Sequence, residues 1–129
     1  MNGEKFDNES LLGKSVLLQF WTTWCPYCKN DQEGVDTIAK EFEDQGLVVL
    51  AVDVAESKKK VEQYLKKYPR ACRIVLTEDT NLAARFAAKA YPIYVLIDPQ
   101  GKIADEKRGG IGEDGIRRML RKVSLPRES

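Results

Sequence analysis

Two cysteines separated by two residues, Cys25 and Cys28, constrain the fold of this chain more than any other feature. An apolar run over residues 15–21 precedes the pair, and a polar stretch with helical periodicity follows from Lys29 onward. This order of strand, cysteine pair and helix places Cys25 at a helix N-terminus. Cysteines with this spacing can close a small disulfide there and pass it to another thiol. The pattern therefore predicts a redox-active dithiol.

Metal binding explains the cysteine pair poorly, because the chain offers too few ligands. It contains three cysteines and no histidine, whereas structural zinc sites and iron–sulfur clusters normally need four ligands of these types. Covalent haem attachment needs a histidine directly after the second cysteine, and Lys29 stands at that position. We expect no metal and no cofactor, with a zinc site shared between two chains as the remaining alternative.

Length and composition fit one domain over residues 1–129, with 43% hydrophobic and 32% charged residues. A net charge of +1 gives no general attraction to nucleic acid or to a membrane surface. No run approaches the roughly 20 apolar residues of a membrane span, and no secretory signal is visible. We expect a monomer that binds no nucleic acid and would meet a membrane only through an anchor absent from this sequence.

Hydrophobic periodicity predicts alternating strands and helices. Expected strands cover residues 15–21, 47–54, 73–76, 93–97 and 102–108. Expected helices cover residues 26–45, 57–68, 81–89 and 113–123. The early strands need helical crossovers and should be parallel, whereas the turn sequence at 98–101 makes the last two an antiparallel hairpin. The fold class is therefore α/β, with one mixed sheet and helices on both faces.

The two cysteines should have different roles. Backbone N–H groups at the helix start stabilise a thiolate at Cys25 and lower the pKa of its thiol, and Pro26 suits the first helical position. Cys28 lies one turn further and should be less exposed, so Cys25 is the expected attacking thiol and Cys28 the resolving thiol. A static disulfide is the alternative, although so small a loop is a poor structural staple.

The segment 24–29 (WCPYCK) resembles the active site of the thioredoxin superfamily. The segment 18–25 is more similar to the TlpA/ResA branch, bacterial thiol-disulfide oxidoreductases that work outside the cytoplasm. Three further segments resemble that branch: 13–14, 53–57 and 91–102. The resemblance covers nearly the whole chain and implies a thioredoxin-like fold.

The resemblance also implies roles for residues around the cysteines. Pro92 would be a cis-proline facing the disulfide, and the backbone of Tyr91 would pair with substrate as an added strand. Glu56 would exchange a proton with the resolving thiol, and Trp24 and Tyr27 would flank the site. The alternatives are a trans proline that starts a strand and a surface glutamate that opens a helix.

Several positions depart from the superfamily pattern. Gln19 stands where thioredoxin has a buried aspartate. A glutamine side chain, unlike that aspartate, cannot titrate. Ile93 replaces the threonine that commonly follows the cis-proline, and Tyr27 replaces the usual glycine or proline between the cysteines. The redox potential therefore cannot be copied from a relative. The third cysteine, Cys72, is expected in the core, with a regulatory or intermolecular disulfide as the alternative.

The cysteine pair and the resemblance together predict a protein-disulfide reductase, and the resemblance implies a thiol-disulfide oxidoreductase of the periplasm or of the outer face of the membrane. Its partners would be protein disulfides or dithiols and an electron donor that the sequence does not identify; cytochrome c maturation is the role that the resemblance suggests. One alternative is a disulfide-forming oxidase, since potentials on this fold run from about −270 to about −120 mV. Others are a thiol peroxidase, suggested only by the spacing of Thr22 and Cys25, and a non-catalytic module that binds a partner around Pro92.

Overall fold

The fold is seen in a computed structural model that describes residues 13–23, 25–53, 57–70, 73–76 and 92–123. Its strands are β1 (Ser15–Trp21), β2 (Leu47–Asp53), β3 (Arg73–Leu76), β4 (Ile93–Ile97) and β5 (Ile103–Arg108). Its helices are α1 (Pro26–Glu41), α2 (Lys58–Lys67) and α4 (Gly112–Leu120). All five predicted strands and three predicted helices are confirmed, and the helix expected over 81–89 lies outside the described residues.

The strands form one mixed sheet in the order β3-β2-β1-β4-β5. The pairs β1–β2 and β2–β3 are parallel, and β4 is antiparallel to both β1 and β5. The pairing aligns Trp21 with Asp53 and Phe20 with Ile93. The ends of β1 and β2 and the start of β4 therefore lie at the same edge of the sheet.

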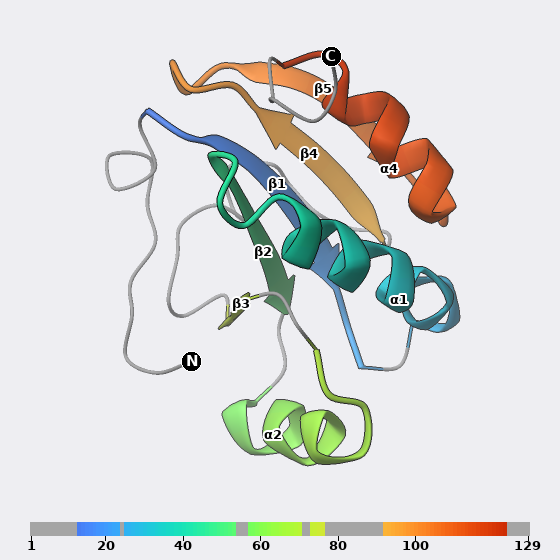
Figure 1. The fold of residues 1–129 in the computed structure, drawn as a ribbon. Coiled ribbons are helices and arrows are strands. Elements are labelled where there is room, and N and C mark those ends of the chain that lie inside the picture. Colours follow the sequence, from blue (N-terminus) through green and yellow to red (C-terminus); the bar gives the residue numbers. More distant parts are fainter. Residues whose placement is uncertain (1–12, 24, 54–56, 71–72, 77–91, 124–129) are drawn as a thin grey trace.

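The two faces of the sheet carry separate apolar clusters because side chains alternate along each strand. On one face, β-strand residues pack with α1, with α4 and with Val61 of α2; Figure 1 shows α1 and α4 crossing this face. The strand residues of this cluster are Leu17, Trp21, Leu47, Val49, Ala51, Tyr94 and Leu96. The opposite cluster includes Val16, Leu18, Phe20, Leu50, Val52, Ile93 and Val95, all buried.

The helix ends follow from local chemistry. α1 stops at Glu41, earlier than the predicted end near Gln45, because a turn with a 2.9 Å bond from the Gln45 N–H to the Phe42 carbonyl follows it. Gly46 then takes φ +84°, a left-handed value that glycine adopts at little cost. Ser57 caps α2, its Oγ accepting the Lys60 N–H at 3.2 Å. In the described part of the chain, no helix is long and apolar enough to cross a membrane.

Candidate active site

Cys25 and Cys28 form a disulfide at the N-terminus of α1, with Cα atoms 5.3 Å apart. Cys25 is the N-cap residue, with extended backbone angles, and Pro26 occupies the first turn. The Sγ atom of Cys25 accepts the backbone N–H of Cys28 at 3.1 Å. An unpaired N–H at a helix start that points to this sulfur would stabilise a thiolate there, which supports Cys25 as the attacking thiol.

Exposure does not distinguish the two cysteines. Cys25 is 4% exposed and Cys28 is 3% exposed, and both belong to the apolar cluster that contains Trp21. The expected lower exposure of Cys28 thus amounts to almost nothing in the disulfide form. The disulfide and the bond from the Cys28 N–H join the Cys25 sulfur to the first turn of α1.

The other predicted site residues are only partly described. Pro92 is buried and directly precedes β4, at the sheet edge where β1 ends. Its carbonyl accepts the Gly109 N–H at 2.9 Å, and the cis form of its peptide bond stays a prediction. Pro26 and Tyr27 open α1, with side chains outside the described parts. The predicted residues outside the described chain are Trp24, Glu56, Cys72 and Tyr91.

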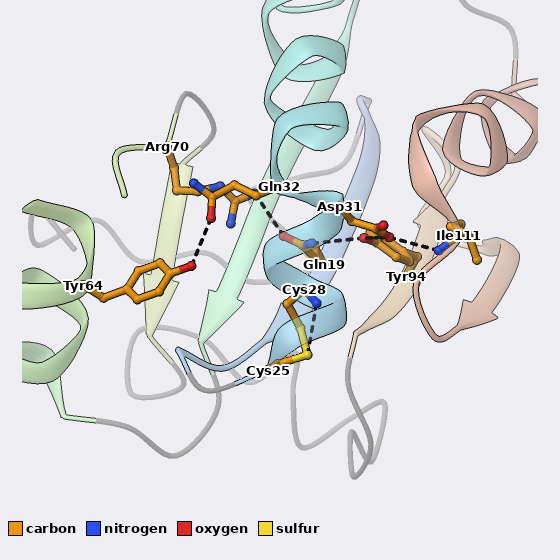
Figure 2. The surroundings of a disulfide bond; sticks show 9 residues. All are labelled: Gln19, Cys25, Cys28, Asp31, Gln32, Tyr64, Arg70, Tyr94 and Ile111. Carbon is orange, nitrogen blue, oxygen red and sulfur yellow. Dashed lines mark hydrogen bonds between the residues drawn. A yellow bond between two sulfur atoms is a disulfide. The ribbon is translucent and has the colours of Figure 1, made fainter. Parts of the chain in front are cut away.

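A buried polar network beside the disulfide was not predicted. The Tyr94 hydroxyl donates to Asp31 Oδ2 at 2.7 Å and accepts from Gln19 Nε2 at 3.1 Å. Asp31 also accepts the backbone N–H groups of Ile111 and Gly112, at 3.0 and 3.2 Å. Figure 2 shows Gln19, Asp31 and Tyr94 around the first turns of α1, near the disulfide. A carboxylate of α1 thus caps the N-terminus of α4, whose own N-cap residue Ile111 makes no side-chain cap bond.

Burial raises the pKa of Tyr94 well above its usual range, and the hydrogen bond to Asp31 raises it further. The tyrosine therefore remains a hydroxyl donor at any physiological pH. Helical periodicity could have identified Asp31 as a buried residue, because it lies on the apolar face of α1 with Cys28, Val35 and Ile38. A carboxylate on such a face requires partners when it is buried.

The network continues from Gln19 to a buried cation. Arg70 Nη2 donates to Gln19 Oε1 at 3.1 Å, and Arg70 Nε donates to Asp36 Oδ1 at 3.0 Å. The side chain of Arg70 is only 1% exposed, and its guanidinium lies 5.6 Å from the ring centre of Trp21. Gln19 is thus more than a non-titrating replacement for aspartate, because it joins the tyrosine and a buried arginine.

Aromatic contacts connect α2 to the start of α1. Trp21 packs on Tyr64 with ring centres 5.3 Å apart, and Tyr64 packs on Tyr68 at 5.0 Å. The Lys29 ammonium lies 3.7 Å from the Tyr68 ring centre, and its hydrogen bond lowers the pKa of Tyr68. Trp21 packs in the core, where it is 1% exposed. No group of three potential metal ligands occurs among the residues that the structure places.

Comparison with known proteins agrees with this geometry. Residues 1–106 match the model of the AhpC/TSA family. The thiol-disulfide oxidoreductase ResA of Bacillus subtilis (strain 168) is 34% identical over 115 residues, which cover 89% of this chain and 64% of that protein. ResA of Halalkalibacterium halodurans is 27% identical over 93% of this chain and 68% of that protein. The chain thus spans about two thirds of the length of these curated relatives.

Solved structures share the fold. MTB dsbF matches with a TM-score of 0.75 and 28% identity, over 88% of this chain and 83% of that chain. The exposed lipoprotein thioredoxin of Streptococcus pneumoniae matches with a TM-score of 0.78 and 26% identity, over 89% of each chain. One conclusion follows from the family match over most of the sequence, the cysteine pair on α1 and these structures. The chain belongs to the AhpC/TSA family and has a thioredoxin-like fold, with ResA-type thiol-disulfide oxidoreductases among its relatives.

Proposed function

We propose that this protein exchanges disulfides with other proteins through Cys25 and Cys28 and works mainly as a reductant. The observation that carries the proposal is the position of the disulfide, with Cys25 as the N-cap of α1 and its sulfur on the Cys28 N–H. A structural staple would gain less from closing so short a loop than from closing a long one. An exchange site gains a stabilised thiolate at the attacking sulfur.

The proposed reaction transfers two electrons to the substrate disulfide. The Cys25 thiolate attacks one substrate sulfur, the substrate S–S bond breaks, and the first substrate thiolate leaves and takes up a proton. Cys28 then loses its proton and attacks the Cys25 sulfur, which releases the second substrate thiolate and forms the Cys25–Cys28 disulfide. An external dithiol must reduce this disulfide before the next cycle.

Two further residues complete the proposed site. Pro92 lies at the sheet edge where β1 leads into the cysteine loop, a position that supports substrate pairing along the backbone of Tyr91. Glu56 follows β2, which ends at that same edge with Asp53, and we assign to it the proton exchange with Cys28.

The reductive direction and the location rest on resemblance. The sequence resembles the TlpA/ResA branch, and its relatives are named ResA. One similar structure is named an exposed lipoprotein thioredoxin. We propose on these grounds that the protein acts outside the cytoplasm, on protein disulfides, with electrons from a donor that remains to be found.

Insulin reduction in the presence of a small dithiol tests the activity. The wild-type protein should accelerate insulin precipitation, Cys25→Ser should fall to the uncatalysed rate, and Cys72→Ser should keep wild-type activity because Cys72 takes no part in the proposed exchange. A wild-type protein that is folded and oxidisable but gives no acceleration would contradict the proposal and favour the non-catalytic binding module.

A further inference from the structure

Five hydrogen-bonded side chains form a continuous chain next to the disulfide. The order is Asp31, Tyr94, Gln19, Arg70 and Asp36, with successive contacts of 2.7, 3.1, 3.1 and 3.0 Å. The chain starts on α1, crosses β4 and β1, and returns to α1 through Arg70, three residues after the end of α2; Figure 2 shows its first four residues. It therefore contacts most of the elements that position the cysteines.

The chain separates the Asp31 carboxylate from the Arg70–Asp36 ion pair. Asp31 is 6% exposed and has no ion pair with any described residue; its charge is stabilised by the Tyr94 hydroxyl and two backbone N–H groups. Arg70 is 1% exposed and pairs with Asp36. The neutral Gln19 and Tyr94 lie between them. Asp31 and Arg70 thus remain separate fixed charges.

Both charges are linked to the cysteines through neighbouring residues. Asp31 is three residues after Cys28, about one turn further along α1. Arg70 lies over the ring of Trp21, which shares the apolar cluster of Cys25 and Cys28. In such a buried setting, water and salt screen a charge much less than at the surface.

A fixed charge here acts unequally on the two redox states. The disulfide is neutral, whereas the reduced pair carries a thiolate. A nearby anion disfavours the thiolate and makes the couple more reducing, and a nearby cation has the opposite effect. We propose that Asp31 and Arg70 are positioning residues that set the reduction potential of the Cys25–Cys28 couple in opposite directions.

The proposal rests on the proposed function only in requiring that the cysteine pair cycles between its two states. It is tested by equilibrating each variant with glutathione at pH 7 and trapping the thiols. Asp31→Asn keeps an acceptor oxygen and should raise the potential. Arg70→Gln should lower it. Each change in the equilibrium constant should be about tenfold, or about 30 mV for a two-electron couple.

Matched variants separate a charge effect from general damage. Glu33→Gln removes the same charge as Asp31→Asn from an exposed position two residues away, and it should change the equilibrium constant less than about twofold. Arg70→Lys keeps the cation and should stay nearer to wild type than Arg70→Gln. The charges of Lys29, Asp36 and Asp53 are the same in all these variants.

The signs of the shifts in reduction potential decide whether the proposal holds. Shifts of opposite sign in Asp31→Asn and Arg70→Gln support the proposal, because loosened packing alone has no reason to reverse with charge. Shifts of the same sign, or changes no larger than that of Glu33→Gln, overturn it. If Arg70→Gln does not fold, Asp31→Asn decides, since an unchanged or lowered potential contradicts the proposal. These shifts are measured whether or not insulin is a substrate, so the two proposals can fail separately.

Discussion

At the scale of single residues, Cys25 differs from Cys28 by its position at the helix start. Cys25 is the N-cap of α1 and its sulfur accepts a backbone N–H, whereas Cys28 lies within the first turn. Burial is nearly equal for the two in the disulfide form. The attacking role that we propose for Cys25 therefore rests on backbone geometry, which the spacing of the cysteines and Pro26 already implied.

This asymmetry predicts which cysteine retains a substrate. Cys28→Ser in a Cys72→Ser background should accumulate a mixed disulfide between Cys25 and a protein substrate, because the resolving thiol is missing. Cys25→Ser in the same background should accumulate at least tenfold less adduct. Non-reducing electrophoresis and mass spectrometry after incubation with an oxidised substrate measure both. Equal trapping by the two variants would contradict the assignment of roles.

Tyr94 gives a prediction for alkaline pH. Its pKa is raised in the folded protein, mainly by burial, so its contribution to stability is complete below the unfolded pKa of about 10 and is lost as pH rises above it. In wild type the free energy of unfolding should fall between pH 10 and 11.5 by up to about 1.4 kcal/mol per pH unit more than in Tyr94→Phe. Urea unfolding at several pH values measures the two slopes.

Tyr68→Phe is the control for this titration. Lys29 lowers the pKa of Tyr68 in the folded protein, so ionisation of Tyr68 favours folding above pH 10, opposite to Tyr94. Tyr68→Phe should keep the steep alkaline loss of wild type. Parallel slopes for wild type and Tyr94→Phe would show that Tyr94 ionises freely in the fold.

At the scale of elements, the contact between α1 and α4 depends on close approach and on charge. Gly34 of α1 faces the backbone of Glu113, where an added Cβ would lie 2.9 Å from the Glu113 Cβ. At the end of α1, Glu41 accepts two hydrogen bonds from Arg117 at 2.8 and 2.9 Å. These hydrogen bonds raise the pKa of Arg117 above its usual value, so the pair stays ionised.

Gly34→Ala should destabilise the protein by about 1–3 kcal/mol, because the added methyl group overpacks the α1–α4 contact. The clash should outweigh the roughly 0.5–1 kcal/mol that alanine normally gains over glycine inside a helix. Glu33→Ala, exposed on the same helix, should stay within about 0.5 kcal/mol of wild type. Chemical denaturation of wild type and the two variants measures their free energies of unfolding. A Gly34→Ala variant as stable as wild type would refute the close contact.

Elements were predictable from the sequence and the buried network was not. Strand and helix positions follow from local hydrophobic periodicity, and the crossover lengths fix parallel pairing of the early strands. The end of α1 was placed too late because its last apolar residue, Phe42, is already outside the helix. The partners of Asp31 are Tyr94, Ile111 and Gly112, distant in the sequence. Periodicity carries no information on such contacts.

At the scale of the whole molecule, the topology gathers distant segments at one edge of the sheet. The end of β1 leads to the cysteines, the end of β2 leads to residue 56, and the start of β4 follows Pro92. The mixed pairing is what achieves this, because β4 runs opposite to β1 and starts where β1 ends. The thioredoxin-like fold thus explains why sequence motifs so far apart were expected to form one site.

The redox state should change global stability. A strong oxidant of this fold has a stabilised reduced form, so a reductant should be more stable when its disulfide is closed. We expect the oxidised protein to exceed the reduced protein by about 2 kcal/mol, or roughly 5–10 °C in Tm. Thermal unfolding of Cys72→Ser with and without a phosphine reductant measures the difference. A higher Tm for the reduced protein would contradict the reductive direction.

The equilibrium reduction potential of the Cys25–Cys28 couple tests the central claim most directly. It is measured by trapping thiols after equilibration in defined glutathione or dithiothreitol buffers, with Cys72→Ser to isolate the pair. A value near or below about −250 mV is predicted for a protein-disulfide reductant. A value near −120 mV would contradict the account and make the protein a disulfide donor.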